Sequence, residues 1–247
     1  MSAEYEPRPP GRLKHAFIRY GLRGLLGTYL RIRVENAELL PERANFLVNF
    51  SHPNWVDPLA IVAHWPDRRL VYIFGPREPD MKVGGRNRII RWGRIAVPFK
   101  PGARDLLDTT KRAMAVLKRC VLIVAGEGRL SDEEGAIVPL EGGPAYLALR
   151  AQVPIVPLAV IGTRWLRFGK RVTLRFGPPL EIAGRRADRQ GIEALTRELT
   201  LAMEKLLEGV QGEPPPGRFG RWLTDVFNER PWLEERSDGG ESQQSGV

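Results

Sequence analysis

The chain has 247 residues, of which 43% are hydrophobic and 27% charged, so it is long enough for one domain with its own core. Its 38 Lys+Arg against 29 Asp+Glu residues give a formal net charge of +9, which favours anionic partners such as lipid surfaces, nucleic acids or phosphate-bearing ligands. The single cysteine, Cys120, excludes an intramolecular disulfide, and its apolar neighbours indicate a core residue.

The first 33 residues divide into a polar segment and a helix. Residues 1–11 are polar and proline-rich, so we expect them to be flexible, and they lack the basic start and apolar stretch of a secretory signal. Residues 12–33 are predicted to form an amphipathic helix that either docks on a membrane or packs on the domain, and both can hold. Its basic stripe has helical spacing and consists of Arg12, His15, Arg19 and Arg23.

Short β-rich runs then alternate with helical patterns from residue 45 to residue 176. This alternation predicts an α/β fold with a mainly parallel sheet flanked by helices. The expected strands are 45–50, 70–74, 94–97, 120–125, 155–161 and 171–176. The expected helices are 58–65, 86–92, 103–118 and 142–151. Because such sheets bind ligands beyond the carboxyl ends of their strands, motifs that directly follow a strand carry the most weight.

The carboxyl-terminal part adds a helix at 188–209, and three prolines at 214–216 then break the chain. We therefore divide the protein into the N-terminus 1–11, the helix 12–33, a main domain 34–210, an amphipathic extension 211–236 and a disordered tail 237–247. No apolar run approaches the ~20 residues that span a bilayer. We expect a protein on the cytoplasmic face of the cell membrane, with peripheral contact only.

The first chemically informative segment runs from Asn49 to Pro58 and follows an apolar strand. On a continuous helix His52 and Asp57 would point about 140° apart. However, a residue before proline avoids the helical region, and Asp is a preferred N-cap. The helix should therefore start at Pro58, which leaves His52 and Asp57 together in one tight loop. The loop either holds a general base oriented by an acid, or contains an ordinary turn histidine and a capping aspartate.

Three further segments attract attention. Gly126–Ser131 also follows an apolar strand and is either a ligand-binding glycine loop or a plain turn, with Glu127, Gly128 and Arg129 as its candidate contacts. Residues 77–119 hold 12 Lys+Arg and 4 Asp+Glu, including Arg94 and Lys100, and form either an anion-binding surface or a solvated helix face. Val153–Thr163 is read mainly as a buried core strand.

Taken together and in their order along the chain, the four segments resemble the glycerolipid acyltransferase family, typified by 1-acyl-glycerol-3-phosphate acyltransferases. His52 to Asp57 matches the family's H-x-x-x-x-D motif, and Gly93–Lys100 looks like its second block. Ala125–Ser131 is similar to the third block, usually F-P-E-G-T-R-S, and Val153–Pro157 matches the fourth, V-P-I-V-P. The resemblance covers roughly residues 35 to 180.

By this resemblance, His52 deprotonates the hydroxyl of a lysolipid acceptor, which attacks the thioester of acyl-CoA or acyl-acyl-carrier protein. Asp57 orients His52, and Glu127, Gly128 and Arg129 hold the acceptor head group with help from Arg94 or Lys100. The resemblance implies no metal and no cofactor beyond the acyl donor. The expected partners are an acyl donor, with acyl carrier protein as one carrier, a lysolipid in phospholipid biosynthesis and an anionic membrane surface.

Several positions depart from the family pattern. Ala125 and Gly126 replace the usual Phe and Pro, Arg129 takes the Thr position, and Lys100 stands where Arg is usual. These changes affect head-group contacts and leave the His–Asp pair intact. The default acceptor is therefore 1-acyl-glycerol-3-phosphate, while another lysolipid or a glycolipid, a thioester hydrolase and a non-catalytic lipid-binding domain remain alternatives. We expect no nucleic-acid partner, because no nucleic-acid-binding motif is recognised.

Overall fold

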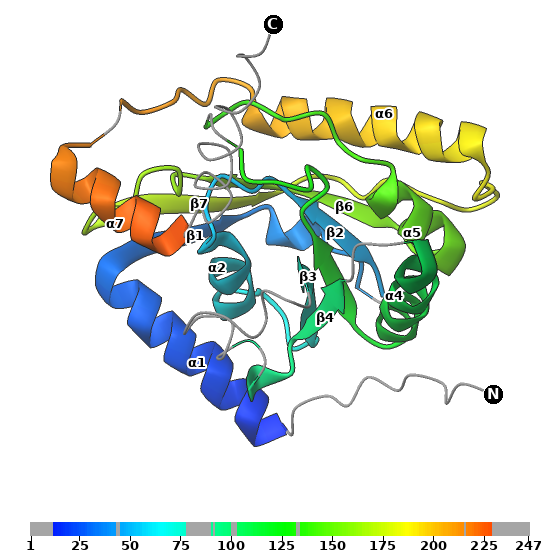
Figure 1. The fold of residues 1–247 in the computed structure, drawn as a ribbon, viewed down its shortest axis with the longest axis horizontal. Coiled ribbons are helices and arrows are strands. Elements are labelled where there is room, and N and C mark those ends of the chain that lie inside the picture. Colours follow the sequence, from blue (N-terminus) through cyan, green and yellow to red (C-terminus); the bar gives the residue numbers. More distant parts are fainter. Residues whose placement is uncertain are drawn as a thin grey trace, which may run out of the picture.

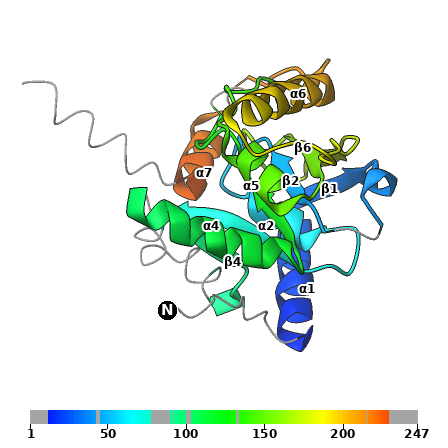
Figure 2. The ribbon, with the colours of Figure 1, turned by 90° about the vertical axis from the view of Figure 1, so that its right-hand side faces the viewer.

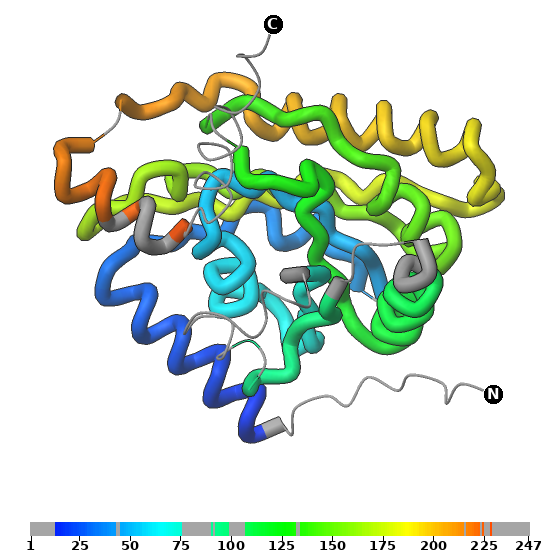
Figure 3. Tube along the Cα trace, viewed as in Figure 1, coloured from blue at the N-terminus to red at the C-terminus, as the bar shows by residue number. Residues whose placement is uncertain are grey.

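The structure is a computed structural model that describes residues 12–42, 45–77, 90, 92–99, 103–131, 134–214 and 216–228 (Figure 3). Its centre is a seven-stranded sheet with the order β1-β7-β6-β2-β5-β3-β4 (Figure 1). All neighbouring strands are parallel except β6 and β7, which run antiparallel. The strands are β1 Leu30–Glu35, β2 Leu47–Phe50, β3 Val71–Arg77, β4 Ala96–Phe99, β5 Val121–Val124, β6 Ile155–Ile161 and β7 Lys170–Phe176.

Helices cover both faces of this sheet, as Figures 1 and 2 show. They are α1 Arg12–Tyr29, α2 Asp57–Ala63, α4 Ala103–Leu117, α5 Gly143–Ala151, α6 Arg189–Leu207 and α7 Arg218–Asn228, with a short 3-10 helix Ala37–Leu39. Successive strand residues point to opposite faces. Val48 and Ile123 therefore pack with α1 and α2, whereas Leu47 and Leu122 pack with α4, α5 and α6. The predicted α/β class with a mainly parallel sheet is confirmed.

The predicted strands and helices of the central region agree with the structure within a few residues. The predicted helix 86–92 lies almost entirely outside the described residues. Cys120 is buried in the core as expected, and burial raises the pKa of its thiol. No described helix is long and apolar enough to cross a membrane.

The predicted helix 12–33 was too long, because it ends at Tyr29 and β1 begins at Leu30. In β1, Leu30, Ile32 and Val34 alternate with charged residues, which is the period of a strand. β1 pairs in parallel with β7 along its whole length. Residues 30–35 thus form a strand because they pair with β7 at the edge of the sheet, although they continue the apolar pattern of α1.

α1 packs on the domain through Ile18 and Leu22, which are buried. Arg19 of the predicted basic stripe is not free for lipid, because its guanidinium donates to the carbonyl oxygens of Trp65 and Asp67. Burial, followed by the charge of Arg19, lowers the pKa of His15, so that residue adds little positive charge near neutral pH. The packing interpretation of this helix is therefore correct, and membrane docking stays a prediction.

Part of the predicted carboxyl-terminal extension forms α7, the orange helix of Figure 1. Residues 229–236 and the tail 237–247 lie outside the described residues, as do residues 1–11.

Candidate functional site

The candidate site lies where the central strands end. Val48 of β2 pairs with Ile123 of β5 on one side and with Val156 of β6 on the other. His52 is four residues beyond Val48, and Glu127 is four residues beyond Ile123. Because these strands are parallel, both residues follow the carboxyl ends of their strands at the same edge of the sheet. This is the edge at which open α/β sheets bind ligands.

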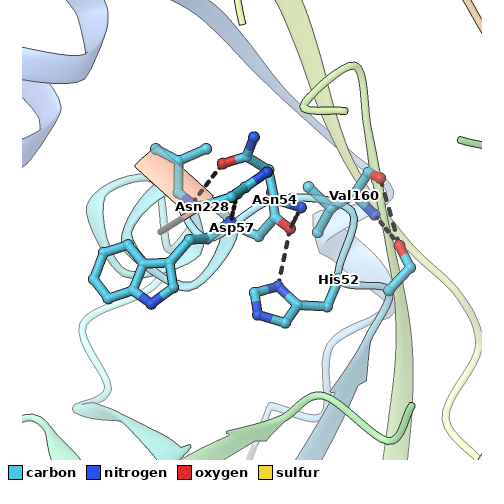
Figure 4. A network of polar contacts seen from close by, with 8 residues as sticks. His52, Asn54, Asp57, Val160 and Asn228 are labelled. Carbon is cyan, nitrogen blue, oxygen red and sulfur yellow. Dashed lines mark hydrogen bonds and ion pairs between the residues drawn. The ribbon is translucent and has the colours of Figure 1, made fainter. Parts of the chain in front are cut away.

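His52 and Asp57 meet in the loop between β2 and α2. Nδ1 of His52 lies 3.0 Å from Oδ2 of Asp57, and the backbone amide of Asn54 donates to the same oxygen at 2.7 Å. The Asp57 side chain is fully buried, whereas 16% of the His52 side chain is exposed. Figure 4 shows the second ring nitrogen of His52 pointing away from Asp57. The imidazole ring is thus oriented through Nδ1, and Nε2 does not take part in the contact with Asp57.

The local sequence explains this loop, with one correction. Pro58 has no amide to leave unsatisfied and suits the first turn of a helix. However, α2 begins at Asp57, with Val56 as the N-cap residue, so the prediction that Asp57 caps the helix was wrong. Instead, the Asp57 carboxylate turns back and accepts from the amide of Asn54, three residues earlier. That turn brings it within reach of His52.

The environment of Asp57 contains opposing influences. Burial raises its pKa, while the hydrogen bond and charge of His52, the Thr163 hydroxyl and the Asn54 amide lower it. In its ionised form the Asp57 carboxylate can only accept, so Oδ2 accepts from the Asn54 amide and from His52 alike. Nδ1 of His52 therefore carries the proton of the shared hydrogen bond, and Nε2 is left with a lone pair that can accept one.

Glu127 lies behind this pair. The residue is only 4% exposed, and neither carboxylate oxygen has a hydrogen-bond partner of normal geometry within the described part of the chain. Burial raises the pKa of Glu127 to about 7, and the nearby charge of Asp57 adds to the rise. The amides of His52 and Val138 and the charge of Arg129 act in the opposite direction. The Glu127 carboxyl, which the sequence predicts to contact a ligand, is therefore buried and partly neutral at pH 7.

Replacing Glu127 by Gln should stabilise the protein at high pH. In the unfolded chain Glu127 ionises near its model value of 4.5, but in the folded protein it ionises only near 7. Wild-type stability is therefore lost progressively as pH rises from 4.5 to about 7, by up to about 3 kcal/mol. We expect Glu127→Gln to exceed the wild type in free energy of unfolding at pH 8, but hardly at pH 4.5, in denaturant titrations.

The exposed Glu204 on α6 provides the control for this measurement. Glu204→Gln should change the free energy of unfolding little at either pH, because a solvated carboxylate has no burial penalty to lose. An equal effect of Glu127→Gln at both pH values would contradict the raised pKa of Glu127.

The two glycines of the loop serve its packing. A Cβ at Gly126 would collide with the side-chain amide of the buried Asn49, and Gly128 has a left-handed φ of 64°. The loop is tied to the His–Asp loop by the amide of Ser131, which donates to the carbonyl oxygen of His52 at 2.9 Å. The glycines thus let the loop approach β2 and the His52–Asp57 pair closely.

The predicted basic contacts separate in space. Arg129 is exposed on the same loop as Glu127. Arg94 is also exposed but lies two residues before Ala96 in β4. Ala96 stands level with Val48 of β2 across the sheet, because Ala96 pairs with Ile73, Ile73 with Ile123, and Ile123 with Val48. Arg94 is therefore at the amino end of its strand, the edge opposite to His52. Lys100 and most of the basic segment around it lie outside the described residues.

Sequence analysis assigned no role to several residues that surround the pair, namely Asn49, Asn54, Thr163 and Asn228. Many of the buried side chains with an unpaired polar atom, counted over the described residues, gather here: Asn49, Asn54, Asp57, Glu127, Thr163 and Asn228. The side-chain oxygen of Asn54 accepts from the amide of Val56 at 3.1 Å, an Asx turn that was readable from the sequence. Unsatisfied buried polar groups call for an explanation, and perturbed titratable groups in one place are typical of a functional site.

A comparison with protein families agrees with this geometry. A family model described as acyltransferase matches residues 31–161, more than half of the chain. The chain belongs to the acyltransferase family. The matched region runs from β1 to the end of β6 and includes both loops of the site. The recognition of a glycerolipid acyltransferase family from four sequence blocks is therefore confirmed.

The fold of this acyltransferase is also found among solved structures. It is similar to the crystal structure of the 1-acyl-sn-glycerophosphate (LPA) acyltransferase PlsC from Thermotoga maritima, with a TM-score of 0.60 and 20% sequence identity. The likeness covers 79% of this chain and 80% of that chain, and at this identity it shows the fold alone. Comparison with curated proteins found no significant match. Among the described residues of the acyltransferase, no three His, Cys, Asp or Glu side chains form a group that could hold a metal ion.

Proposed function

We propose that this acyltransferase moves a fatty acyl group from acyl-CoA or acyl-acyl-carrier protein to the hydroxyl of a lysophospholipid, with 1-acyl-glycerol-3-phosphate as the primary acceptor. The observation that carries the proposal is the 3.0 Å contact between His52 Nδ1 and the buried Asp57 carboxylate. This contact orients the ring and sets its tautomer, so that Nε2 can act as a general base.

The reaction then needs only one proton carrier. Nε2 of His52 takes the proton of the acceptor hydroxyl while its oxygen attacks the thioester carbonyl carbon. The resulting tetrahedral intermediate collapses, the C–S bond breaks, and the leaving thiolate receives the proton from His52. Asp57 remains ionised and stabilises the imidazolium that forms between the two steps. Neither a metal ion nor a covalent acyl-enzyme is required by this sequence of steps.

The proposed head-group site is the loop 126–131. Arg129 is exposed there and carries a guanidinium that can bind a phosphate through two hydrogen bonds. An ionised Glu127 would repel a phosphate, so its burial and raised pKa favour a supporting role behind the loop. Lys100 follows β4 and stays a proposed contact, whereas the position of Arg94 gives its proposed role no support.

We also propose that the enzyme works at a membrane surface. Leu13, Phe17 and Tyr20 on α1 are 88%, 70% and 64% exposed, which is unusual for large apolar side chains on a helix packed in water. Such residues fit the apolar part of a lipid interface.

Product analysis tests the proposal directly. The protein is incubated with acyl-CoA or acyl-acyl-carrier protein and a panel of lysophospholipids and lysoglycolipids, and the products are identified by mass spectrometry. We expect a new diacyl lipid, formed fastest from 1-acyl-glycerol-3-phosphate. Free fatty acid at the same rate with and without an acceptor would instead identify a thioester hydrolase.

A further inference from the structure

α7 lies outside the region that the family model matches. One face of α7 contacts residues 51–56, the loop between β2 and α2 that holds His52, which we call the catalytic loop. Residues four apart lie on one side of a helix, and here Gly220, Thr224 and Asn228 share the inner side. Thr224 and Asn228 are buried, with 0% and 1% exposure. The Thr224 hydroxyl accepts from the amide of Leu166, and the Asn228 side-chain oxygen accepts from the amide of Trp55 at 3.0 Å. α7 therefore bridges the loop after β6 and the loop that holds His52.

The Asn228 contact is specific to the catalytic loop. Trp55 lies between His52 and Asp57, and Figure 4 shows Asn228 beside the His52–Asp57–Asn54 network. The two bonded residues are 173 positions apart in the sequence. The hydrogen bond fixes the backbone of a segment that contains no regular secondary structure of its own, so the position of α7 influences the position of the loop.

The opposite side of α7 is apolar and basic. Phe219 and Trp222 are 73% and 58% exposed, and their ring centroids are 5.7 Å apart. At about 100° per residue, both point away from the Thr224 side of the helix. Arg218 is exposed about 40° from Trp222 around the helix. Arg221 is exposed on the flank of the helix, about 100° from Trp222, and its Nε donates to the carbonyl oxygen of Pro216 at 3.2 Å. We call these four residues the α7 patch.

Neighbouring residues extend this surface. Phe168 is 79% exposed in the loop that Thr224 holds, and its ring contacts Tyr29 at the end of α1 at a centroid distance of 6.0 Å. The acidic Glu213 does not offset the arginines, because it is paired with the buried Lys170 at 2.5 Å. Exposed aromatic rings among arginines suit the boundary of an anionic bilayer, where rings enter the interface and guanidinium groups meet lipid phosphates.

We propose that α7 docks on an anionic lipid surface through the α7 patch and, with its opposite face, holds the catalytic loop through Asn228. Asn228 is then a positioning residue, which acts on His52 through the backbone of Trp55. This inference rests on the proposed function in one respect, namely that the loop held by α7 performs acyl transfer. The lipid-docking part stands on the exposed side chains alone.

Vesicle sedimentation tests the docking part without any catalysis. The probe is vesicles of equal parts phosphatidylcholine and phosphatidylglycerol, and the variant is the double substitution Phe219→Ser/Trp222→Ser in the full chain. We expect its binding to fall about tenfold or more, because apolar area and basic charge together set interfacial affinity. Arg218→Gln/Arg221→Gln should weaken binding to these vesicles but not to vesicles of phosphatidylcholine alone.

Leu201 on α6 supplies the matched control, since it is 65% exposed on a different helix. Leu201→Ser should bind vesicles like the wild type. Unchanged binding of Phe219→Ser/Trp222→Ser, or an equal loss in Leu201→Ser, would overturn the docking role. A wild-type dimer that becomes monomeric in Phe219→Ser/Trp222→Ser, seen by sedimentation velocity, would assign the patch to a protein interface instead.

Kinetics with a lysophospholipid below its micellar concentration test the positioning part. We expect Asn228→Ala to lower kcat about tenfold or more with little change in KM, because a misplaced base slows chemistry more than binding. Asn228→Asp keeps an acceptor for the Trp55 amide and should restore most of kcat. A folded Asn228→Ala enzyme with wild-type kcat would exclude the positioning role. If the wild type itself forms no product, the proposed function fails while the vesicle result still decides the docking role.

Discussion

His52→Ala is expected to lower acyl transfer by about 10²–10⁴-fold, the range that general-base assistance contributes to enzymatic rates. The variant loses Nε2, the atom that removes the proton from the acceptor hydroxyl in our mechanism. Folding should survive, because the imidazole is partly exposed and its ring contacts are with Asp57 and with Phe50, at a centroid distance of 5.4 Å. The measurement is the rate of diacyl lipid formation, with vesicle binding and the unfolding temperature recorded alongside.

His64 offers a matched control for this substitution. It is a half-buried histidine at the end of α2, and its Nδ1 lies 3.3 Å from the carbonyl oxygen of Ala60. His64→Ala removes the same side chain and should leave the rate of acyl transfer near that of the wild type. Undiminished turnover in a folded His52→Ala protein would refute the general-base mechanism. Lipid binding without turnover in the wild type would favour the non-catalytic alternative.

Asp57→Asn is the second change with a large expected effect, and it acts through the charge beside His52. The asparagine oxygen can still accept from the Asn54 amide and from Nδ1. The neutral side chain, however, no longer stabilises the imidazolium that forms when Nε2 takes the proton of the acceptor hydroxyl. We expect a loss of about 10²–10⁴-fold in kcat. The free energy of unfolding should not fall in proportion, because the substitution removes a buried carboxylate whose pKa burial already raises.

Asp188, the N-cap of α6, is the control for this pair of measurements. Its carboxylate accepts from the amide of Gly191 at 2.8 Å, and asparagine caps a helix about as well as aspartate. Asp188→Asn should therefore change neither the rate nor the stability much. A fully active Asp57→Asn enzyme would show that the charge of Asp57 does not support His52 in the reaction.

Local patterns accounted for much of the fold. The apolar runs at 120–125 and 155–161 and the helical periodicity at 103–118 correspond closely to β5, β6 and α4. These predictions succeed because the periods of strands and helices are properties of the backbone and appear in any short window. The loop between β2 and α2 was predictable in its position, but α2 begins at Asp57 and not at Pro58, so the argument from the residue before proline failed there.

Other features depended on which segments meet in space. Residues 30–35 alternate apolar and charged side chains, but this short strand period directly follows a helical pattern, and pairing with β7 makes the segment a strand. Arg94 was expected near the site but precedes its strand, so the direction of β4 places it at the far edge of the sheet. The expected strand 94–97 of a parallel sheet already has Arg94 at its amino end, and the family resemblance, not the strand pattern, assigned Arg94 to the site.

The sequence by itself therefore determined the class of fold, the family and the loop in which His52 and Asp57 are close neighbours. Only the tertiary structure decided how deeply Glu127 and Asp57 are buried. It also decided that Arg19 hydrogen-bonds to the backbone of Trp65 and that Asn228 hydrogen-bonds to the backbone of Trp55. The physical reason is one of range. Backbone preference and periodicity act over a few residues, whereas desolvation and long-range hydrogen bonds depend on segments that the fold brings together.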